Sequence, residues 1–158
     1  MDAPALRAWR PDDRAAALAL LEETFLHTWQ PQLSAAAIRR YRRDRVAEGY
    51  VDAHGAAFLI AECDGRVAGL LHASAGSVEA LHVTRRHRRR GIARRLVLAA
   101  EAGMRAQGIA LAGLETDTFN LESQALFLAL GYREVARYPD RKWNCGLTTI
   151  RYEKPLTP

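Results

Sequence analysis

The feature that most constrains this chain is a basic, glycine-containing turn that links an apolar run to a long amphipathic segment. The turn is residues 88–93, Arg-Arg-Arg-Gly-Ile-Ala, and the apolar run before it spans residues 78–83. This order predicts a strand, a turn and a helix. Such a turn directs unpaired backbone N–H groups to one point, where the positive end of the helix dipole reinforces them. The sequence therefore predicts a pyrophosphate site at the start of the helix.

The residue types within the turn support the same prediction. Gly91 and the small Ala93 let phosphate oxygens approach the backbone closely, and the arginines add charge-assisted hydrogen bonds. The chain lacks both the Walker pattern and the dinucleotide pattern of glycines. The alternative, that the arginines only coat a solvated surface or touch nucleic acid, does not explain Gly91 and Ala93. The candidate phosphate-binding residues are Arg88, Arg89, Arg90, Gly91, Ile92, Ala93 and Arg94.

Composition sets wide limits on the class of protein. A chain of 158 residues with 49% hydrophobic residues predicts one folded domain over residues 1–158. It has no apolar run of membrane-spanning length, and its N-terminus does not resemble a secretory signal. Cys63 and Cys145 lack metal-ligand spacing, so no metal site is predicted and a reducing cytoplasm is the expected location. The net charge of +5 suits an anionic ligand or weak nucleic-acid adhesion equally.

Turn signals and hydrophobic periodicity predict a mixed α/β domain. Asp64-Gly65 between apolar runs indicates a β-hairpin, and Asp13, Ser34 and Asn120 are candidate helix N-caps. On the helix after the basic turn, Arg94, Glu101 and Arg105 are expected on the solvent face. The predicted strands are residues 5–10, 56–63, 66–75, 78–83, 111–116, 132–138 and 149–153, and the predicted helices are residues 13–26, 34–48, 92–106 and 120–130.

Two segments in the same order resemble the GNAT N-acetyltransferase superfamily. Arg-x-x-Gly-x-Ala, after a strand ending Leu81-His82-Val83, resembles the family's acetyl-CoA signature, Gln/Arg-x-x-Gly-x-Gly/Ala. Residues 120–132 resemble its second cofactor segment, Asn-x-x-Ala-x-x-x-Tyr-x-x-x-Gly-Phe. The resemblance covers about residues 6–154, and residues 116–132 are similar to a bacterial subgroup of unassigned substrate.

The resemblance implies a fold, a cofactor and a set of binding residues. The fold would be α/β (α+β), with a mixed, mostly antiparallel central sheet of about six to seven strands flanked by about four helices. The cofactor would be acetyl-CoA, with its pantetheine arm in a notch between two splayed parallel strands. By resemblance, the Val83 N–H would polarise the thioester carbonyl. The other residues expected to contact the arm or line its wall are Leu81, His82, Asn120, Ser123 and Phe127.

Glu79 is the best candidate for a catalytic general base. Strand alternation predicts Glu79, Leu81 and Val83 on one face, with Val78, Ala80 and His82 on the other. A carboxylate there could reach the incoming amine directly or through water. Alternatively, Glu79 is an ordinary polar strand residue or a substrate anchor, or His82 is the base. In relatives the catalytic glutamate often stands at another position of this strand, and the nearest such position here is Ser77.

The expected general acid is absent from its usual position. The family's tyrosine aligns with Phe127, which has no proton to donate. The thiolate could leave unassisted, because a thiol of pKa about 8.5 is a fair leaving group. Alternatively, Ser123 could hold a water molecule in the same place.

Three functional hypotheses follow from these residues. The first is an acetyl-CoA-dependent N-acetyltransferase acting on a primary amine of a small molecule or a peptide. The second is a non-catalytic or weakly active acyl-CoA-binding module of the same fold, which Phe127 favours. The third, a nucleic-acid-binding domain, requires base-stacking aromatics near the basic turn, and the sequence places none there. No membrane partner is expected, and a homodimer is left open.

Overall fold

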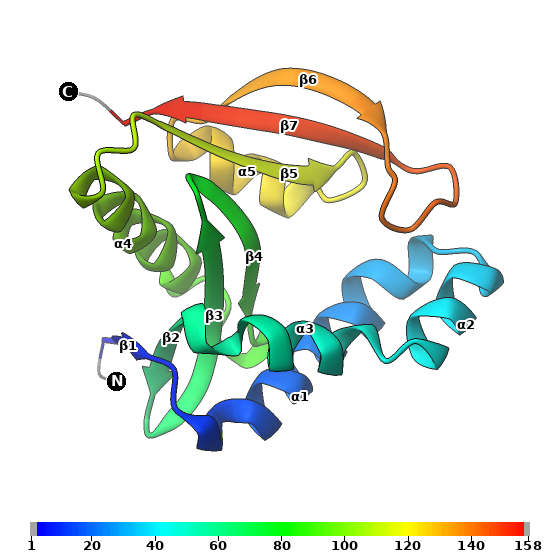
Figure 1. Ribbon diagram of the computed structural model, residues 1–158, viewed down its shortest axis with the longest axis horizontal. Helices are drawn as coiled ribbons and strands as arrows, with labels where there is room; N and C mark the ends of the chain where they lie inside the picture. Colours follow the sequence, from blue (N-terminus) through cyan, green and yellow to red (C-terminus); the bar gives the residue numbers. More distant parts are fainter. Residues whose placement is uncertain (1–2, 157–158) are drawn as a thin grey trace.

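One twisted sheet runs through the protein, and Figure 1 shows its strands diverging near the centre. The computed structural model describes residues 3–156, and within them the seven-stranded sheet has the order β1-β2-β3-β4-β5-β7-β6. All neighbouring strands are antiparallel except β4 and β5. The expected mixed, mostly antiparallel sheet is confirmed. The strands are β1 (Ala5–Ala8), β2 (Phe58–Cys63), β3 (Arg66–Ser74), β4 (Ser77–Val83), β5 (Leu111–Asp117), β6 (Arg133–Pro139) and β7 (Thr148–Pro155).

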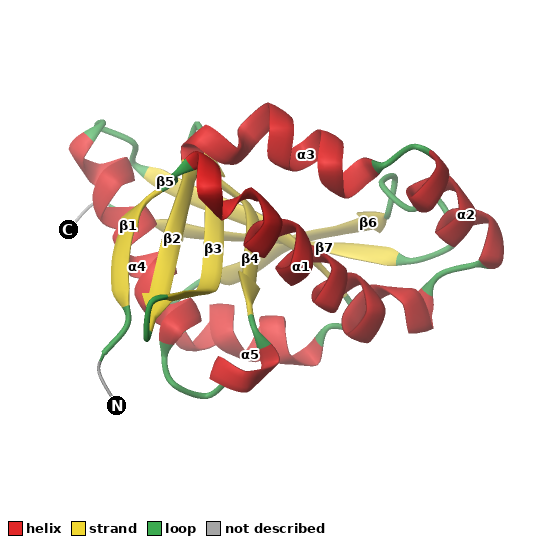
Figure 2. Cartoon of the chain, turned by 90° about the horizontal axis from the view of Figure 1, so that it is seen from below, coloured by secondary structure: helices red, strands yellow, loops and turns green. Residues whose placement is uncertain are grey.

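Helices cover both faces of this sheet (Figure 2). Five α-helices occur in the described residues, one more than expected, because the predicted helix 34–48 is interrupted. The break follows Asp44, where Arg45 has a left-handed φ of 50°. The helices are α1 (Arg14–Thr24), α2 (Ala35–Arg43), α3 (Val46–His54), α4 (Ile92–Ala106) and α5 (Leu121–Ala129).

The turn between β2 and β3 and two of the three predicted helix caps are confirmed. Asp64 and Gly65 both have positive φ, 52° and 75°, as a two-residue hairpin of type I′ requires. The Ser34 hydroxyl accepts a hydrogen bond from the Ala37 N–H, and Asn120 Oδ1 accepts one from the Ser123 N–H. The Asp13 cap was wrong, because its carboxylate instead accepts hydrogen bonds from the Arg7 guanidinium and the Arg10 N–H.

The chain stays helical beyond residue 26, where the sequence predicted that the first helix ends. It continues as a π-helical turn, η2 (Phe25–Trp29), and then as a short 3₁₀ turn, η3 (Gln30–Gln32). The wider π-helical turn changes the direction of the side chains that follow α1. Such turns are rare and are frequent at functional sites.

Close packing on the sheet fixes the position of α4. Ile92, Leu96 and Val97 are almost fully buried in the larger core cluster. Beneath them lies Gly69, where an added Cβ would approach Ile92 to 3.2 Å and Leu96 to 3.3 Å. A glycine therefore lets the first turns of α4 lie directly on β3, which places the helix N-terminus beside the end of β4.

The prediction of a solvent-facing Glu101 was wrong. Its side chain is fully buried, accepts a 2.9 Å hydrogen bond from the Tyr132 hydroxyl and lies 2.8 Å from Lys154 Nζ. Arg105, one turn later on α4, lies 3.7 Å away. The partners come from the end of the chain, 31 and 53 residues away, so helical periodicity alone did not reveal them.

Replacing Lys154 by methionine should therefore destabilise the fold. The change leaves the buried Glu101 carboxylate with Tyr132 and the more distant Arg105, and breaking a buried pair costs about 3 kcal/mol. Urea unfolding measures the loss, and the double variant Glu101→Gln, Lys154→Met should recover much of it. Equal stability of the Lys154→Met variant and the parent would show that this ion pair contributes nothing.

Candidate active site

A cavity of about 460 Å³ opens where β4 and β5 separate. The two parallel strands pair only at Ser77–Gly113 and Val78–Leu114. Beyond these positions β4 continues along β3, whereas β5 remains paired with β7. The splay that the resemblance implied is therefore present. It leaves one edge of β4 without a strand partner from Glu79 to Val83.

A β-bulge in β4 changes the direction of Glu79. His72 pairs with Ala80, but the next residue of β3, Ala73, pairs with Val78, so Glu79 is the extra residue. As a result Val78 packs in the same core cluster as Leu81 and Val83, and the predicted strict alternation was wrong. Bulges are common beside active sites, where they re-aim a side chain. Glu79 lines the cavity.

The backbone of β4 presents donors to the cavity at alternate residues. The Thr84 N–H bonds to the Ala68 carbonyl on β3, and the His82 carbonyl also points to β3, close to Gly69. Because successive residues alternate in direction, the N–H groups of Leu81 and Val83 point away from β3 toward the gap. The backbone groups of His82 therefore belong to the sheet, although the residue itself lines the cavity.

The N-terminus of α4 forms a basic end of the cavity. Gly91 precedes the helix with a φ of 75°, and the first backbone bond of the helix runs from the Arg95 N–H to the Gly91 carbonyl. The N–H groups of the preceding residues are left for a ligand or water. The turn residues that line the cavity are Arg88, Arg89, Gly91, Ile92, Ala93 and Arg94.

Two details of this basic end were not expected from the sequence. Arg90 does not line the cavity; it lies in a second hollow with Cys63, Asp64 and Arg66. Arg88 reaches across the mouth of the cavity and donates a 3.0 Å hydrogen bond to Glu122 of α5. A bound phosphate would compete with this carboxylate for the Arg88 guanidinium.

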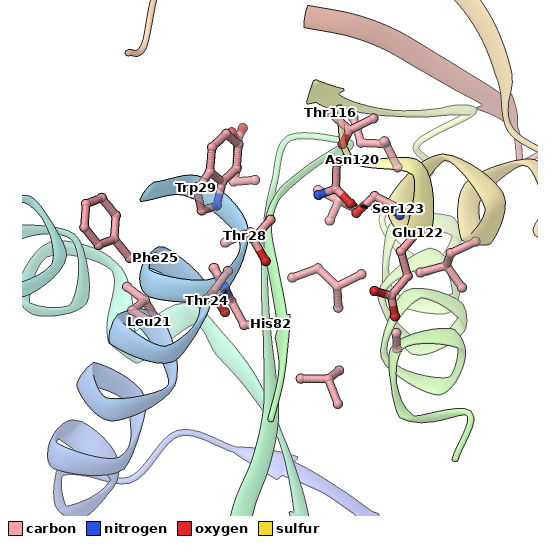
Figure 3. A pocket seen from close by; sticks show the side chains of 18 of the residues that line it. Leu21, Thr24, Phe25, Thr28, Trp29, His82, Thr116, Asn120, Glu122 and Ser123 are labelled. Atoms are coloured by element: carbon pink, nitrogen blue, oxygen red, sulfur yellow. Dashed lines mark hydrogen bonds between the residues drawn. The ribbon is translucent and has the colours of Figure 1, made fainter. Parts of the chain in front are cut away.

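The opposite wall is the start of α5 (Figure 3). Asn120 caps the helix by accepting a hydrogen bond from the Ser123 N–H through Oδ1, and its amide nitrogen points toward the cavity. Ser123 and Phe127 line the same wall. Phe127 is only 5% exposed and packs edge-to-face on Tyr132, with ring centroids 5.7 Å apart. Its ring is part of the core as well as of the cavity.

His82 connects β4 to α1 through its side chain. Its Nδ1 is hydrogen-bonded to the Thr24 hydroxyl at 3.0 Å (Figure 3). Burial, together with the smaller effect of the nearby positive charge of Lys142, lowers the pKa of His82 to about 4. The imidazole is therefore neutral at physiological pH. A neutral, hydrogen-bonded His82 is better suited to positioning α1 than to collecting a proton.

The end of the cavity farthest from α4 is aromatic and acidic. Trp29 and Trp143 contact each other with ring centroids 5.2 Å apart, and Glu79 and Glu115 contribute carboxylates from β4 and β5. Sequence reasoning found no acidic cluster because these carboxylates lie on strands that meet only after folding. Lys142, between β6 and β7, also lines this end.

Tyr50 of α3 lies behind Glu79 and was missed by the sequence analysis. It lines the cavity, and its hydroxyl shares a hydrogen bond with Nδ1 of the buried His72. Burial raises the pKa of Tyr50, and the Glu79 charge raises it further. Tyr50 was not predictable as a cavity residue because the predicted helix ended at residue 48, so α3 (Val46–His54) was not foreseen as a helix of its own.

Residues 3–156 contain neither a candidate metal site nor a candidate membrane-spanning helix. No group of three or more His, Cys, Asp or Glu side chains there could hold a metal ion. No helix in the same range is long and apolar enough to cross a membrane.

Comparison with known proteins identifies the family. Residues 14–132 match the Acetyltransferase (GNAT) family. The chain is 28% identical over 114 residues to mouse (Mus musculus) N-acetyltransferase 8B, an alignment covering 66% of this chain and 49% of that protein. The chain thus spans about half the length of this curated relative. It belongs to the GNAT acetyltransferase family.

Solved structures share the fold over nearly the whole chain. A GCN5-related N-acetyltransferase from Rhodopseudomonas palustris is 20% identical with a TM-score of 0.79, over 98% of this chain and 97% of that one. The PaiA N-acetyltransferase from Thermoplasma acidophilum, solved in complex with coenzyme A, is 18% identical with a TM-score of 0.75, over 98% and 99% of the chains.

The pKa of His82 provides a direct test of this geometry. An imidazole resonance of His82 should titrate near pH 4 and not near 6.5, and Lys142→Met should raise that value by removing a neighbouring charge. Because the folded pKa is below the unfolded one, the unfolded chain binds the proton first. The contribution of His82 to stability is then lost as pH falls from about 6.5 to about 4. NMR titration of the parent and of the Lys142→Met variant measures both pKa values. A His82 pKa near 6.5 in the parent would show that the imidazole is not buried as described.

Proposed function

We propose that this protein transfers the acetyl group of acetyl-CoA to a primary amine of a small molecule or a peptide, by direct attack of the amine on the thioester. One observation carries the proposal: a single cavity joins the basic N-terminus of α4 to the acidic, aromatic end, past the unpaired edge of β4. The donor and the acceptor can therefore meet beside Val83.

The residues of the donor half fit coenzyme A. The unpaired N–H groups at the start of α4, with Arg88, Arg89 and Arg94, suit its pyrophosphate and its further phosphate. The Leu81 N–H and the amide nitrogen of Asn120 offer polar contacts for the amide-containing pantetheine arm. When bound, the cofactor supplies an activated acetyl thioester.

The chain's own residues then position the reacting groups. The Val83 N–H points into the gap, where it can donate a hydrogen bond to a carbonyl oxygen that gains negative charge. Preorganised donors of this kind contribute about 10²- to 10³-fold in rate. Glu79, turned by the bulge, can accept the proton that the acceptor amine loses, directly or through water. Phe127 donates no proton to the departing thiolate.

A second candidate is a non-catalytic or weakly active acyl-CoA-binding module. The buried, apolar Phe127 at the usual position of the acid favours it. Such a protein would bind coenzyme A but would release thiol slowly with every amine. The two candidates differ in turnover and share the donor site.

The donor site is tested by Gly91→Glu. This variant places a side chain and a negative charge at the proposed phosphate site, at a φ of 75° that side chains rarely adopt. We expect it to abolish coenzyme A binding in calorimetry and the rise in melting temperature that binding gives the parent.

The matched control is Gly103→Glu, on an exposed part of the same helix where an added Cβ meets nothing within 4 Å. It should bind coenzyme A like the parent. Unchanged affinity in a folded Gly91→Glu variant would show that the cofactor binds elsewhere. If the parent does not bind coenzyme A at millimolar concentration, the assignment of this cofactor is wrong.

The acceptor side is tested by Glu79→Gln. Release of free thiol from acetyl-CoA, followed with a panel of primary amines, should reveal turnover by the parent. The variant should be slower by about 10²-fold, mainly at low pH, where the amine is protonated and most needs a base. If the Glu79→Gln variant has the same rate as the parent at every pH, Glu79 is not the base, and water or the substrate itself accepts the proton.

A further inference from the structure

Lys142 occupies the acceptor end of the cavity. Its Nζ lies 5.8 Å from the ring centroid of Trp29 and 5.5 Å from that of Trp143. Both rings line the cavity that also contains Glu79 and Val83. The sequence contains two lysines, and the other, Lys154, is held by the buried Glu101. One of the two lysine amines thus lies at the end of the cavity that is proposed for the acceptor.

The loop that carries Lys142 is held in place by hydrogen bonds. The carboxylate of Asp140 accepts from the backbone N–H groups of Lys142, Trp143 and Asn144, at 3.2, 2.8 and 3.3 Å. The guanidinium of Arg40 on α2 donates to the Trp143 carbonyl. The position of Lys142 in the cavity therefore follows from the local fold and is more defined than that of an ordinary surface lysine.

The surroundings of the Lys142 amine increase the share of its reactive, neutral form. Protein atoms surround the end of the Lys142 side chain, and the resulting desolvation lowers the pKa of its amine. The carboxylates of Asp140, Asp117, Glu79 and Glu115 act in the opposite direction, so they are near the amine but do not outweigh desolvation. The charge of Lys142 also acts on His82, next to Val83 in β4.

We propose that Lys142 is an acetylation site of this protein, modified by its own acetyl-CoA in the same chain. The neutral Nζ attacks the thioester carbonyl carbon, a nitrogen–carbon bond forms and the carbon–sulfur bond breaks. The proton lost from nitrogen passes to Glu79 or water, and the sulfur leaves as the thiol of coenzyme A. The products are Nε-acetyl-lysine at position 142 and free coenzyme A. This inference rests on the proposed function and names an acceptor for it.

The opposing interpretation is that Lys142 only packs against the two tryptophans. A cation over an aromatic face is a common stabilising contact. The two interpretations differ in the fate of the amine when acetyl-CoA is present without any other acceptor.

The experiment is to incubate the folded protein with acetyl-CoA alone and to map acetylated peptides by mass spectrometry over time. We expect one acetyl group on Lys142, formed at least about tenfold faster than on Lys154, because a held nucleophile gains from proximity. The rate per molecule should not depend on protein concentration. Unfolding in urea should remove the preference, and Lys154→Arg should retain modification of Lys142.

The other outcomes distinguish failure of the self-acetylation from failure of the proposed function. If calorimetry shows that coenzyme A binds but Lys142 stays unmodified, the self-acetylation is wrong and the proposed function stands. If coenzyme A does not bind, both fail. A rate proportional to protein concentration would show modification between molecules, and equal acetylation of Lys142 and Lys154 would show chemical background only.

Discussion

The rest of the structure depends on the separation of β4 from β5 after only two paired positions, Ser77–Gly113 and Val78–Leu114. Each strand keeps a full antiparallel partner on its other side, β3 for β4 and β7 for β5, so the separation costs few backbone hydrogen bonds. Residues of β2–β4 and residues of β5 and β7 nevertheless pack in one core cluster beneath α4. The two parts of the sheet, β1–β4 and β5–β7, are therefore joined where β4 and β5 pair and separate beyond that point, and the cavity lies in the gap.

Two glycines favour this arrangement because an added Cβ would meet close neighbours at each position. At Gly69 a Cβ would meet the His82 carbonyl at 3.0 Å and the side chains of α4, so glycine lets the helix lie against the sheet. At Gly113, where the strands part, a Cβ would displace the Arg151 guanidinium from its present position. One glycine thus brings the positive end of α4 to the cavity, and the other leaves room at the point of separation for a charged side chain from β7.

Local signals in the sequence predicted those parts of the fold that local interactions determine. The Asp64-Gly65 hairpin, the Ser34 and Asn120 caps and the start of α4 at Gly91 all depend on residues within one turn of each other. The bulge at Glu79, the burial of Glu101 and the approach of Lys142 to Trp29 depend on contacts between distant segments. Periodicity carries no information about such contacts. The basic end of the cavity was accordingly more predictable than its aromatic and acidic end.

The opposite charges at the two ends of the cavity give the proposed reaction its direction. An anionic donor is attracted by the arginines at the start of α4 and repelled by Glu79 and Glu115, so its phosphates can lie only at the basic end. The reactive end of its arm must then face the carboxylates and tryptophans. A cationic acceptor has the reverse preference, but it meets Lys142 there and must either displace that amine or lie beside it. The carboxylates around this end compensate a positive charge whether Lys142 or a substrate carries it, which is why one site can suit both.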